Sequence, residues 1–228
     1  MKLKEKTQTM SENKQAYIAK KKREYRKQTG KKCENINPEV CAKCGGMCCK
    51  SSGCSLMPCD VRQMSVKGIK EMLDTGNYSL RVIELIFDKK VEYIVGMSSR
   101  RVNNQRVENN WLDGRCVLLT ENGCMLSDED RPTGALLSIP SADPSKECKL
   151  IVSHFEYTDE WKKYATILNK VLYDETGHTP EEQYIESAMQ TYKFLGDKLQ
   201  KGAALDEFEV EMYTKAQMTI VRAKNKYC

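Results

Sequence analysis

The amino-acid sequence predicts an α+β fold: a small Cys-rich metal-binding domain with a short β-hairpin, followed by a helical C-terminal hairpin or bundle. Three observations lead to this prediction. Seven of the eleven cysteines lie between residues 33 and 59. The pair Asn122-Gly123 separates two short apolar runs, which is the strongest local signal for a hairpin. From residue 155 onward, apolar residues recur with the period of an α-helix.

The composition is that of a soluble globular chain, with 228 residues of which 40% are hydrophobic and 30% charged. No apolar run approaches the roughly 18 residues that a membrane-spanning helix needs, so we expect no membrane partner. The start, MKLKEKTQTM, lacks the apolar stretch of a secretory signal peptide. We therefore expect a cytoplasmic protein. In that reducing compartment, clustered cysteines are more often metal ligands or redox groups than disulfides.

Cysteines and charges divide the chain into three parts. Residues 1–32 form a basic N-terminal arm, helical or mobile, with 12 Lys/Arg and three Glu. Residues 33–153 hold ten of the cysteines and form the predicted metal-binding domain. Residues 154–228 form a helical region that we expect to pack on it. The chain after residue 32 carries 25 basic and 29 acidic residues, so the net charge of +5 comes from the arm.

The arm predicts a helix over 15–27, with Ser11 as a possible cap, although its apolar residues form no clear stripe. The basic run at 20–23 suggests a nucleic acid or another anionic surface as a partner. The alternative is a solvated chain end. The acidic remainder of the chain and the lack of alternating basic and aromatic residues argue against nucleic acid.

The next part of the chain predicts two helices and a strand. The first helix lies within 60–76, with Ser65 as its cap and Gly76 as its stop. The segment 79–87 predicts another short helix. The segment 91–95 alternates Val-Glu-Tyr-Ile-Val and predicts a strand.

The hairpin signal lies in the middle of the chain. The run Arg-Cys-Val-Leu-Leu-Thr at 115–120 predicts a strand, the segment 121–123 a turn, and 124–126 the return strand. Such a hairpin would bring Cys116 and Cys124 near each other.

The C-terminal region predicts three amphipathic stretches. Trp161, Tyr164, Leu168, Val171 and Leu172 share one stripe. Thr179-Pro180-Glu181-Glu182 is a complete helix start, with a cap, a proline at the first position and a glutamate at the third. Gly202 interrupts the pattern before a last helix that contains Phe208, Met212 and Ala216. We interpret these stripes as packing faces.

The densest chemistry is the motif C-x2-C-x3-C-C, formed by Cys41, Cys44, Cys48 and Cys49. A C-x2-C pair lets two thiolates reach one metal ion from a tight turn. Gly45 and Gly46 remove the Cβ atoms that would hinder the chain from bending back. Cys54 and Cys59 add two further donors. Buried small side chains and a disulfide knot are the alternatives. The density of cysteines argues against the first, and the missing export signal argues against the second.

The strings CAKCGGMCCK and GRCVLLTENGCMLSDEDRP resemble the YkgJ-type cysteine-cluster family, described as a zinc- or iron-chelating domain. The matching positions are Cys41, Cys44, Cys48, Cys49, Cys116, Cys124, Arg131 and Pro132. The resemblance covers roughly residues 40–150 and implies metal binding without naming a reaction. Many members carry a cysteine soon after the Arg-Pro pair. This chain has Thr133-Gly134 there, and Cys148 is a candidate replacement. Similar clusters occur in flagellin lysine methylases, which suggests an enzymatic alternative.

The predicted metal ligands are Cys41, Cys44, Cys48, Cys49, Cys54, Cys59, Cys116, Cys124 and Cys148, while Cys33 and Cys228 lie at the margins. Nine thiolates suit a zinc site, or an iron–sulfur cluster as the alternative cofactor. A closed all-cysteine site is typical of structural zinc, and its metal would supply much of the folding free energy of this domain.

Few other catalytic groups are available. His154 is a possible further ligand, His178 lies in a loop before a helix, and residues 128–130 form an acidic turn. Three hypotheses follow: a metal-binding protein of unknown downstream role, an iron–sulfur enzyme for electron or group transfer, and a nucleic-acid-binding zinc module.

Overall fold

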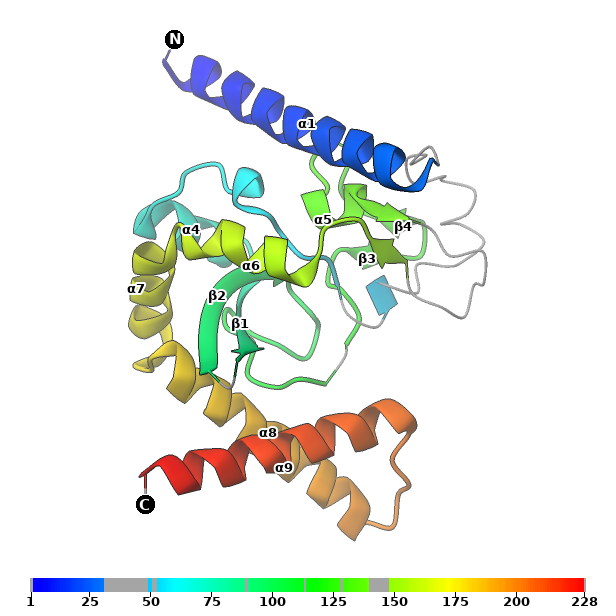
Figure 1. Cartoon of the computed structure of the whole chain (residues 1–228), viewed down its shortest axis with the longest axis vertical. Coiled ribbons are helices and arrows are strands. Elements are labelled where there is room, and N and C mark those ends of the chain that lie inside the picture. The colour runs from blue at the N-terminus through cyan, green and yellow to red at the C-terminus, as the bar shows by residue number, and fades with distance from the viewer. Residues whose placement is uncertain are drawn as a thin grey trace.

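The computed structural model describes residues 2–30, 49–50, 53–88, 90–112, 114–127, 129–139 and 148–227, with side chains from residue 12 to 226. A long two-stranded hairpin lies at the centre, helices cover one side of it, a long N-terminal helix crosses the top of Figure 1, and a helix pair crosses the bottom. The molecule is therefore α+β, as the sequence predicts.

The central hairpin pairs β1 (Tyr78–Phe87) with β2 (Lys90–Ser99) in antiparallel register, from Tyr78↔Ser99 to Phe87↔Lys90. The predicted strand at 91–95 is confirmed within β2. The predicted short helix at 79–87 is wrong, because these residues form β1. The segment is rich in β-branched and aromatic residues, and ladder bonds to β2 along its whole length outweigh any local helical preference.

One face of β2 packs on α6 (His154–Lys162) and α7 (Ala165–Thr176). Trp161 is fully buried, and its Nε1–H donates to the Leu56 carbonyl at 3.1 Å. The Tyr157 hydroxyl donates to the Met97 carbonyl at 2.9 Å. A Cβ atom on Gly96 would lie 2.8 Å from that hydroxyl, so only glycine permits this close approach.

The main core consists of Leu56, Met57, Val61, Ile69, Leu73, Leu80, Ile83, Leu85, Ile94, Val95, Met97, Val107, Leu137, Val152, Tyr157, Trp161, Leu168, Val171 and Leu172. These residues come from both sides of position 153. The first two C-terminal helices thus share one core with the central hairpin.

Short helices close one edge of this core. α4 (Val66–Asp74) begins at Ser65, whose side chain accepts from the Gly68 N–H at 3.1 Å, and it is followed by Gly76 at φ +72°. The predicted helix over 60–76 is confirmed for 66–74, with its cap and its stop, whereas residues 61–65 lie outside the helix. The 3-10 helix η1 (Pro58–Asp60) and α5 (Thr133–Leu136) lie next to α1.

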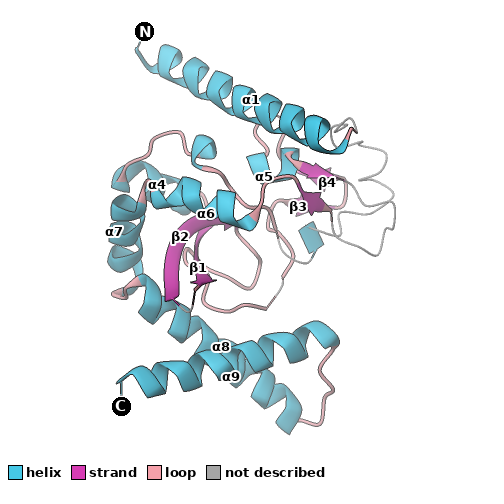
Figure 2. Ribbon diagram, in the orientation of Figure 1, coloured by secondary structure: helices cyan, strands magenta, loops and turns pink. Residues whose placement is uncertain are grey.

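The C-terminal part ends in the helix pair α8 (Pro180–Gln200) and α9 (Glu207–Tyr227), drawn as crossing cyan ribbons in Figure 2. The predicted capping box of α8 is confirmed, since Thr179 and Glu182 exchange hydrogen bonds. Gly202 adopts φ +77° between the helices. α8 buries Tyr184, Ala188 and Leu195. Of the packing residues predicted in the last helix, Met212 and Ala216 are buried, whereas Phe208 is exposed.

Two further ladders are short. β3 (Leu119–Thr120) pairs with β4 (Gly123–Cys124), which confirms the predicted hairpin, although its strands are shorter than expected. β5 (Ser138–Ile139) pairs with β6 (Lys149–Leu150). In the part of the chain that the structure describes, no helix is long and apolar enough to cross a bilayer.

The N-terminal arm is the single helix α1 (Lys2–Thr29), which runs through Ser11, so the suggested cap there is wrong. Tyr17 and Ile18 pack against the main core. Two neighbouring apolar residues are enough to dock the helix, although they form no stripe along it.

Candidate metal site

Three of the predicted ligands come together in one small apolar cluster. Cys116 is 3% exposed and is buried with Leu118 and Leu119, while Cys49 and Cys124 are half-buried against them. Cys49 belongs to the dense N-terminal motif, and the other two belong to the hairpin region. We call Cys49, Cys116 and Cys124 the sulfur cluster.

The β3–β4 hairpin positions Cys124. Cys124 lies opposite Leu119 in the ladder, and Met125 N–H donates to the Leu118 carbonyl at 2.9 Å. Gly123 adopts φ +100°, a conformation that side chains disfavour, and its carbonyl accepts from the Thr120 hydroxyl at 2.7 Å. The Asn-Gly turn therefore places Cys124 opposite Leu119, three residues after Cys116.

Backbone hydrogen bonds hold Cys116 between two other segments. Cys116 N–H donates to the Cys49 carbonyl at 2.6 Å. Cys116 also lies opposite Arg101 in an antiparallel bridge, and Val117 N–H donates to the Arg100 carbonyl at 2.9 Å. The sulfur cluster is thus anchored to the continuation of β2, which is rigidly packed.

Cys54 lies beside the same end of β2. Ser99 N–H donates to the Cys54 carbonyl at 2.8 Å, and Cys54 N–H donates to the Ser99 hydroxyl at 2.6 Å. Cys54 bonds to Ser99, the last residue of β2, and Cys116 lies opposite Arg101, two residues further along the chain. The two cysteines therefore contact nearby positions at the end of β2. Cys54 is half-buried.

Cys59 belongs to a different environment, next to the main core. Its sulfur lies 3.5 Å from the Thr133 hydroxyl oxygen. The Thr133 hydroxyl donates its proton to Asp60 at 2.7 Å, so its oxygen is left to accept from the Cys59 S–H. Burial and the neighbouring Asp60 carboxylate raise the pKa of the Cys59 thiol to about 11. These contacts favour the neutral thiol, whereas a metal ligand is a thiolate.

The Asp60 carboxylate is the centre of a network that the sequence did not predict. It also accepts from the backbone N–H groups of Thr133 at 2.9 Å and of Met57 at 2.8 Å, and Lys14 Nζ of α1 lies 3.2 Å away. Lys14 further donates to the Arg131 carbonyl. Asp60, two residues after Pro58, is a local helix-start signal, but nothing in the sequence pairs it with Lys14 or Thr133.

The remaining predicted residues are placed as follows. Cys148 is half-buried and directly precedes β6. Six of the residues named in the sequence analysis lie outside the described residues: Cys33, Cys41, Cys44, Cys48, Cys228 and Asp128.

The other candidate residues are an acidic turn and two histidines. In the predicted acidic turn, Glu129 and Asp130 are exposed, and Asp130 bonds to Ser127. His154 is exposed at the start of α6, and partial burial together with nearby Arg81 and Lys215 lowers its pKa. The His178 ring lies 3.3 Å from Gln183.

The described donors fit part of a thiolate site. The cysteines that the structure describes are free of disulfide bonds, and three of them share one apolar cluster. Among the described residues, no three Cys, His, Asp or Glu side chains are grouped closely enough to hold a metal ion on their own. A complete set of ligands therefore requires further donors.

Comparisons with family models, curated proteins and solved structures give no match. The resemblance to the YkgJ-type family stays a prediction based on the cysteine motifs. The chemistry of this site is accordingly argued from its own residues.

Proposed function

We propose that this protein binds zinc through a cage of cysteine thiolates, with an iron–sulfur cluster as the alternative occupant. The proposed ligands are Cys49, Cys116 and Cys124 together with Cys41, Cys44 and Cys48 of the same N-terminal motif. Cys54 and Cys148 are further donors. We leave Cys59 outside the cage because it packs against the main core and not in the sulfur cluster, with its sulfur 3.5 Å from the Thr133 hydroxyl oxygen.

The observation that carries the proposal is the 2.6 Å hydrogen bond from Cys116 N–H to the Cys49 carbonyl. It joins the two cysteine-bearing parts of the chain, and it does so at the last residue of the C-x2-C-x3-C-C motif. A thiolate cage assembled from distant pieces of sequence needs such a junction to bring its donors together.

The surroundings of the sulfur cluster suit a soft cation. Leu118, Leu119 and Leu126 exclude water from one side, which strengthens the attraction between thiolates and a cation. Bound zinc would lower the pKa of these thiols and link the hairpin to the N-terminal motif. The role of the chain's own residues is to hold the sulfurs at fixed positions.

The test is metal analysis of protein that is produced and purified without oxygen. We expect a colourless protein with at least one zinc ion per chain by mass spectrometry. Iron together with visible absorbance would identify the alternative occupant. A chain that contains neither metal would contradict the proposal.

Matched cysteine variants locate the site. Cys116→Ser and Cys124→Ser each remove one proposed ligand, and we expect both to lose most of the bound metal. Cys59→Ser keeps a hydroxyl that can still donate to Thr133, and we expect it to retain the metal content of the unmodified chain. Equal losses in the three variants would contradict the proposed ligand set.

A further inference from the structure

The outward face of α1 is a second candidate binding surface. Its side chains are cationic, unlike the thiols of the sulfur cluster. α1 carries ten basic residues and three glutamates. The structure divides those whose side chains are described between two faces, because the helix is held in one orientation on the body.

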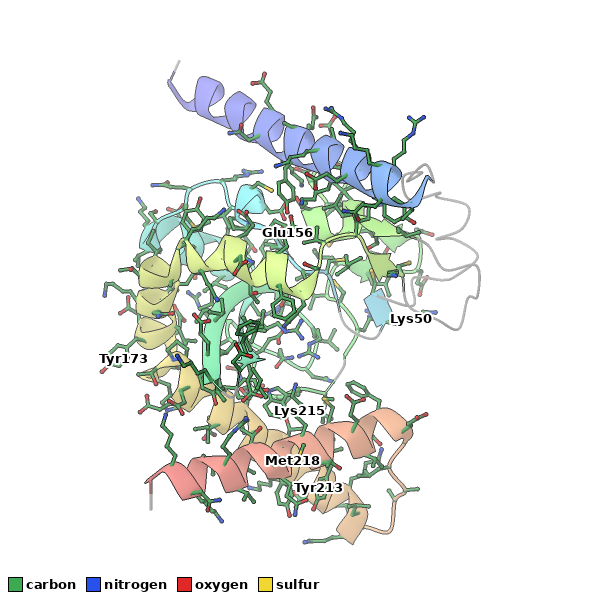
Figure 3. All side chains as sticks on the ribbon, viewed as in Figure 1. Lys50, Glu156, Tyr173, Tyr213, Lys215 and Met218 are labelled. Carbon is green, nitrogen blue, oxygen red and sulfur yellow. The ribbon has the colours of Figure 1, made fainter. Side chains whose placement is uncertain are left out.

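The inward face is fixed by specific contacts. Lys14 pairs with Asp60 at 3.2 Å, and both side chains are at least 87% buried, at 13% and 5% exposure. Lys21 pairs with Glu156 of α6, and the Tyr17 hydroxyl donates to the same carboxylate at 3.2 Å. Figure 3 shows Glu156 in the space between α1 and α6. The helix therefore cannot rotate without breaking buried ion pairs.

The outward face then presents a fixed basic ridge, which we define as Lys20, Arg23, Arg26 and Lys27. All four residues are exposed, and the Lys20 side chain is 70% accessible. The one carboxylate beside them, Glu24, is turned toward Lys21 at 2.8 Å and lies 4.0 Å from Lys20. Within the described chain, no carboxylate lies within ion-pair distance of Arg23, Arg26 or Lys27.

The cations of the ridge repel one another. Arg23 faces Arg26 at i+3 and Lys27 at i+4, the spacings at which like charges on a helix interact unfavourably. An anionic partner would remove that repulsion.

The chemistry of the ridge favours a phosphate backbone over a membrane surface. A helix that binds a bilayer surface inserts an apolar face. The apolar residues Tyr17 and Ile18 of α1 are already packed against the main core, and the exposed residues Ala16 and Ala19, which precede the ridge, have only small side chains. Lys and Arg cations attract phosphates irrespective of the base, which predicts binding without sequence preference.

We propose that the basic ridge of α1 binds the phosphate backbone of nucleic acid. The four cations lie within eight residues, or about 10 Å of helix, so they contact about four phosphates of one site. The rest of the chain is acidic overall and does not extend this surface. The expected dissociation constant is therefore in the range of about 1–100 µM at physiological salt, as for non-specific binding.

The test is fluorescence anisotropy of the full-length chain with a 20-base-pair DNA duplex and a single-stranded RNA of the same length. Four phosphate contacts predict a salt slope of about −3.6 on DNA, so that affinity falls about 100-fold between 50 and 200 mM KCl. Both probes share the phosphate chemistry, and their relative affinities identify the preferred form.

The decisive variant replaces the ridge by Lys20→Gln, Arg23→Gln, Arg26→Gln and Lys27→Gln, which keeps good helix formers. The control removes the same charge elsewhere, by Lys67→Gln, Lys163→Gln, Lys170→Gln and Lys193→Gln on exposed helix faces. We expect the ridge variant to lose at least tenfold in affinity and the control to stay within about threefold, with unchanged circular dichroism in both.

Three results would overturn the proposal. The first is no binding of either probe at 50 mM KCl. The second is an equal loss of affinity in the ridge and control variants, since that would show an effect of net charge alone. The third is tighter binding to phosphatidylserine vesicles than to both nucleic acids, since that would identify a membrane surface as the partner.

Discussion

The Cys59 thiol and the Asp60 carboxylate are neighbours in sequence, and the carboxylate acts on the thiol. Asp60 accepts hydrogen bonds from the backbone N–H groups of Met57 and Thr133 and pairs with Lys14. The same negative charge, added to burial, disfavours a second anion at Cys59. A cysteine close to the dense motif in sequence can therefore differ in chemistry from the members of the sulfur cluster.

This difference predicts how Cys59 reacts with iodoacetamide. Only the thiolate reacts, and raising the pKa from 9 to about 11 lowers the thiolate fraction at pH 8 about 100-fold. The labelling rate of Cys59 should therefore keep rising with pH beyond 9 and reach half of its maximum only near pH 11. Peptide mass spectrometry of the folded protein measures this rate. Unfolded protein serves as the control, and a half-maximal rate near pH 9 in the folded state would contradict the prediction.

At the scale of elements, the sequence predicts those whose signals are local. The α8 capping box at Thr179 and the turn at Gly123 each depend on residues a few positions apart, and both are confirmed. β1 was missed because its strand state depends on pairing with β2, and a segment of ten residues fits either pattern locally. The Lys14–Asp60 pair joins the first helix to the middle of the chain, so no local pattern reports it.

The same reasoning applies to the candidate site. The approach of Cys116 to Cys124 was predictable because one hairpin carries both. The contact between Cys49 and Cys116 has no local signal in the sequence. It could be expected only because both residues are candidate ligands of one metal site. The separate environment of Cys59 was not predictable, since it depends on Thr133 of α5 and on the docking of α1.

Gly134 shows how closely α5 approaches the segment that contains Cys54. Its N–H donates to the Ser55 carbonyl at 3.2 Å, and an added Cβ would lie 2.3 Å from that oxygen. We expect Gly134→Ala to lower the free energy of unfolding by about 1–3 kcal/mol, because the backbone of Ser55 must move.

Gly196→Ala in α8 is the matched control, since nothing lies within 4 Å of its added Cβ. Urea denaturation should show a neutral or slightly stabilising effect there, by up to about 1 kcal/mol. Equal effects in the two variants would contradict the argument.

At the scale of the whole molecule, the main core and the sulfur cluster are separate hydrophobic units. The main core surrounds Trp161 and holds no member of the sulfur cluster, whose apolar neighbours are Leu118, Leu119 and Leu126. The sequence led us to expect that metal supplies much of the folding free energy of residues 33–153. The structure divides that range, because much of it packs in the main core with α6 and α7.

Removal of the proposed metal should therefore loosen one part of the molecule and leave the other folded. We expect a chelator to raise hydrogen exchange in residues 114–126, since β3 and β4 are only two residues long and contribute little stability alone. The emission of Trp161 should stay that of a buried indole, because its ring is fully buried and its N–H remains bonded to Leu56. The measurement uses the Trp111→Phe variant, in which Trp161 is the single remaining tryptophan of the two in the chain. Cys116→Ser without chelator should give the same exchange pattern as the chelated protein. A red shift of Trp161 on metal removal would show instead that the two units fold as one, and that the metal stabilises the whole chain.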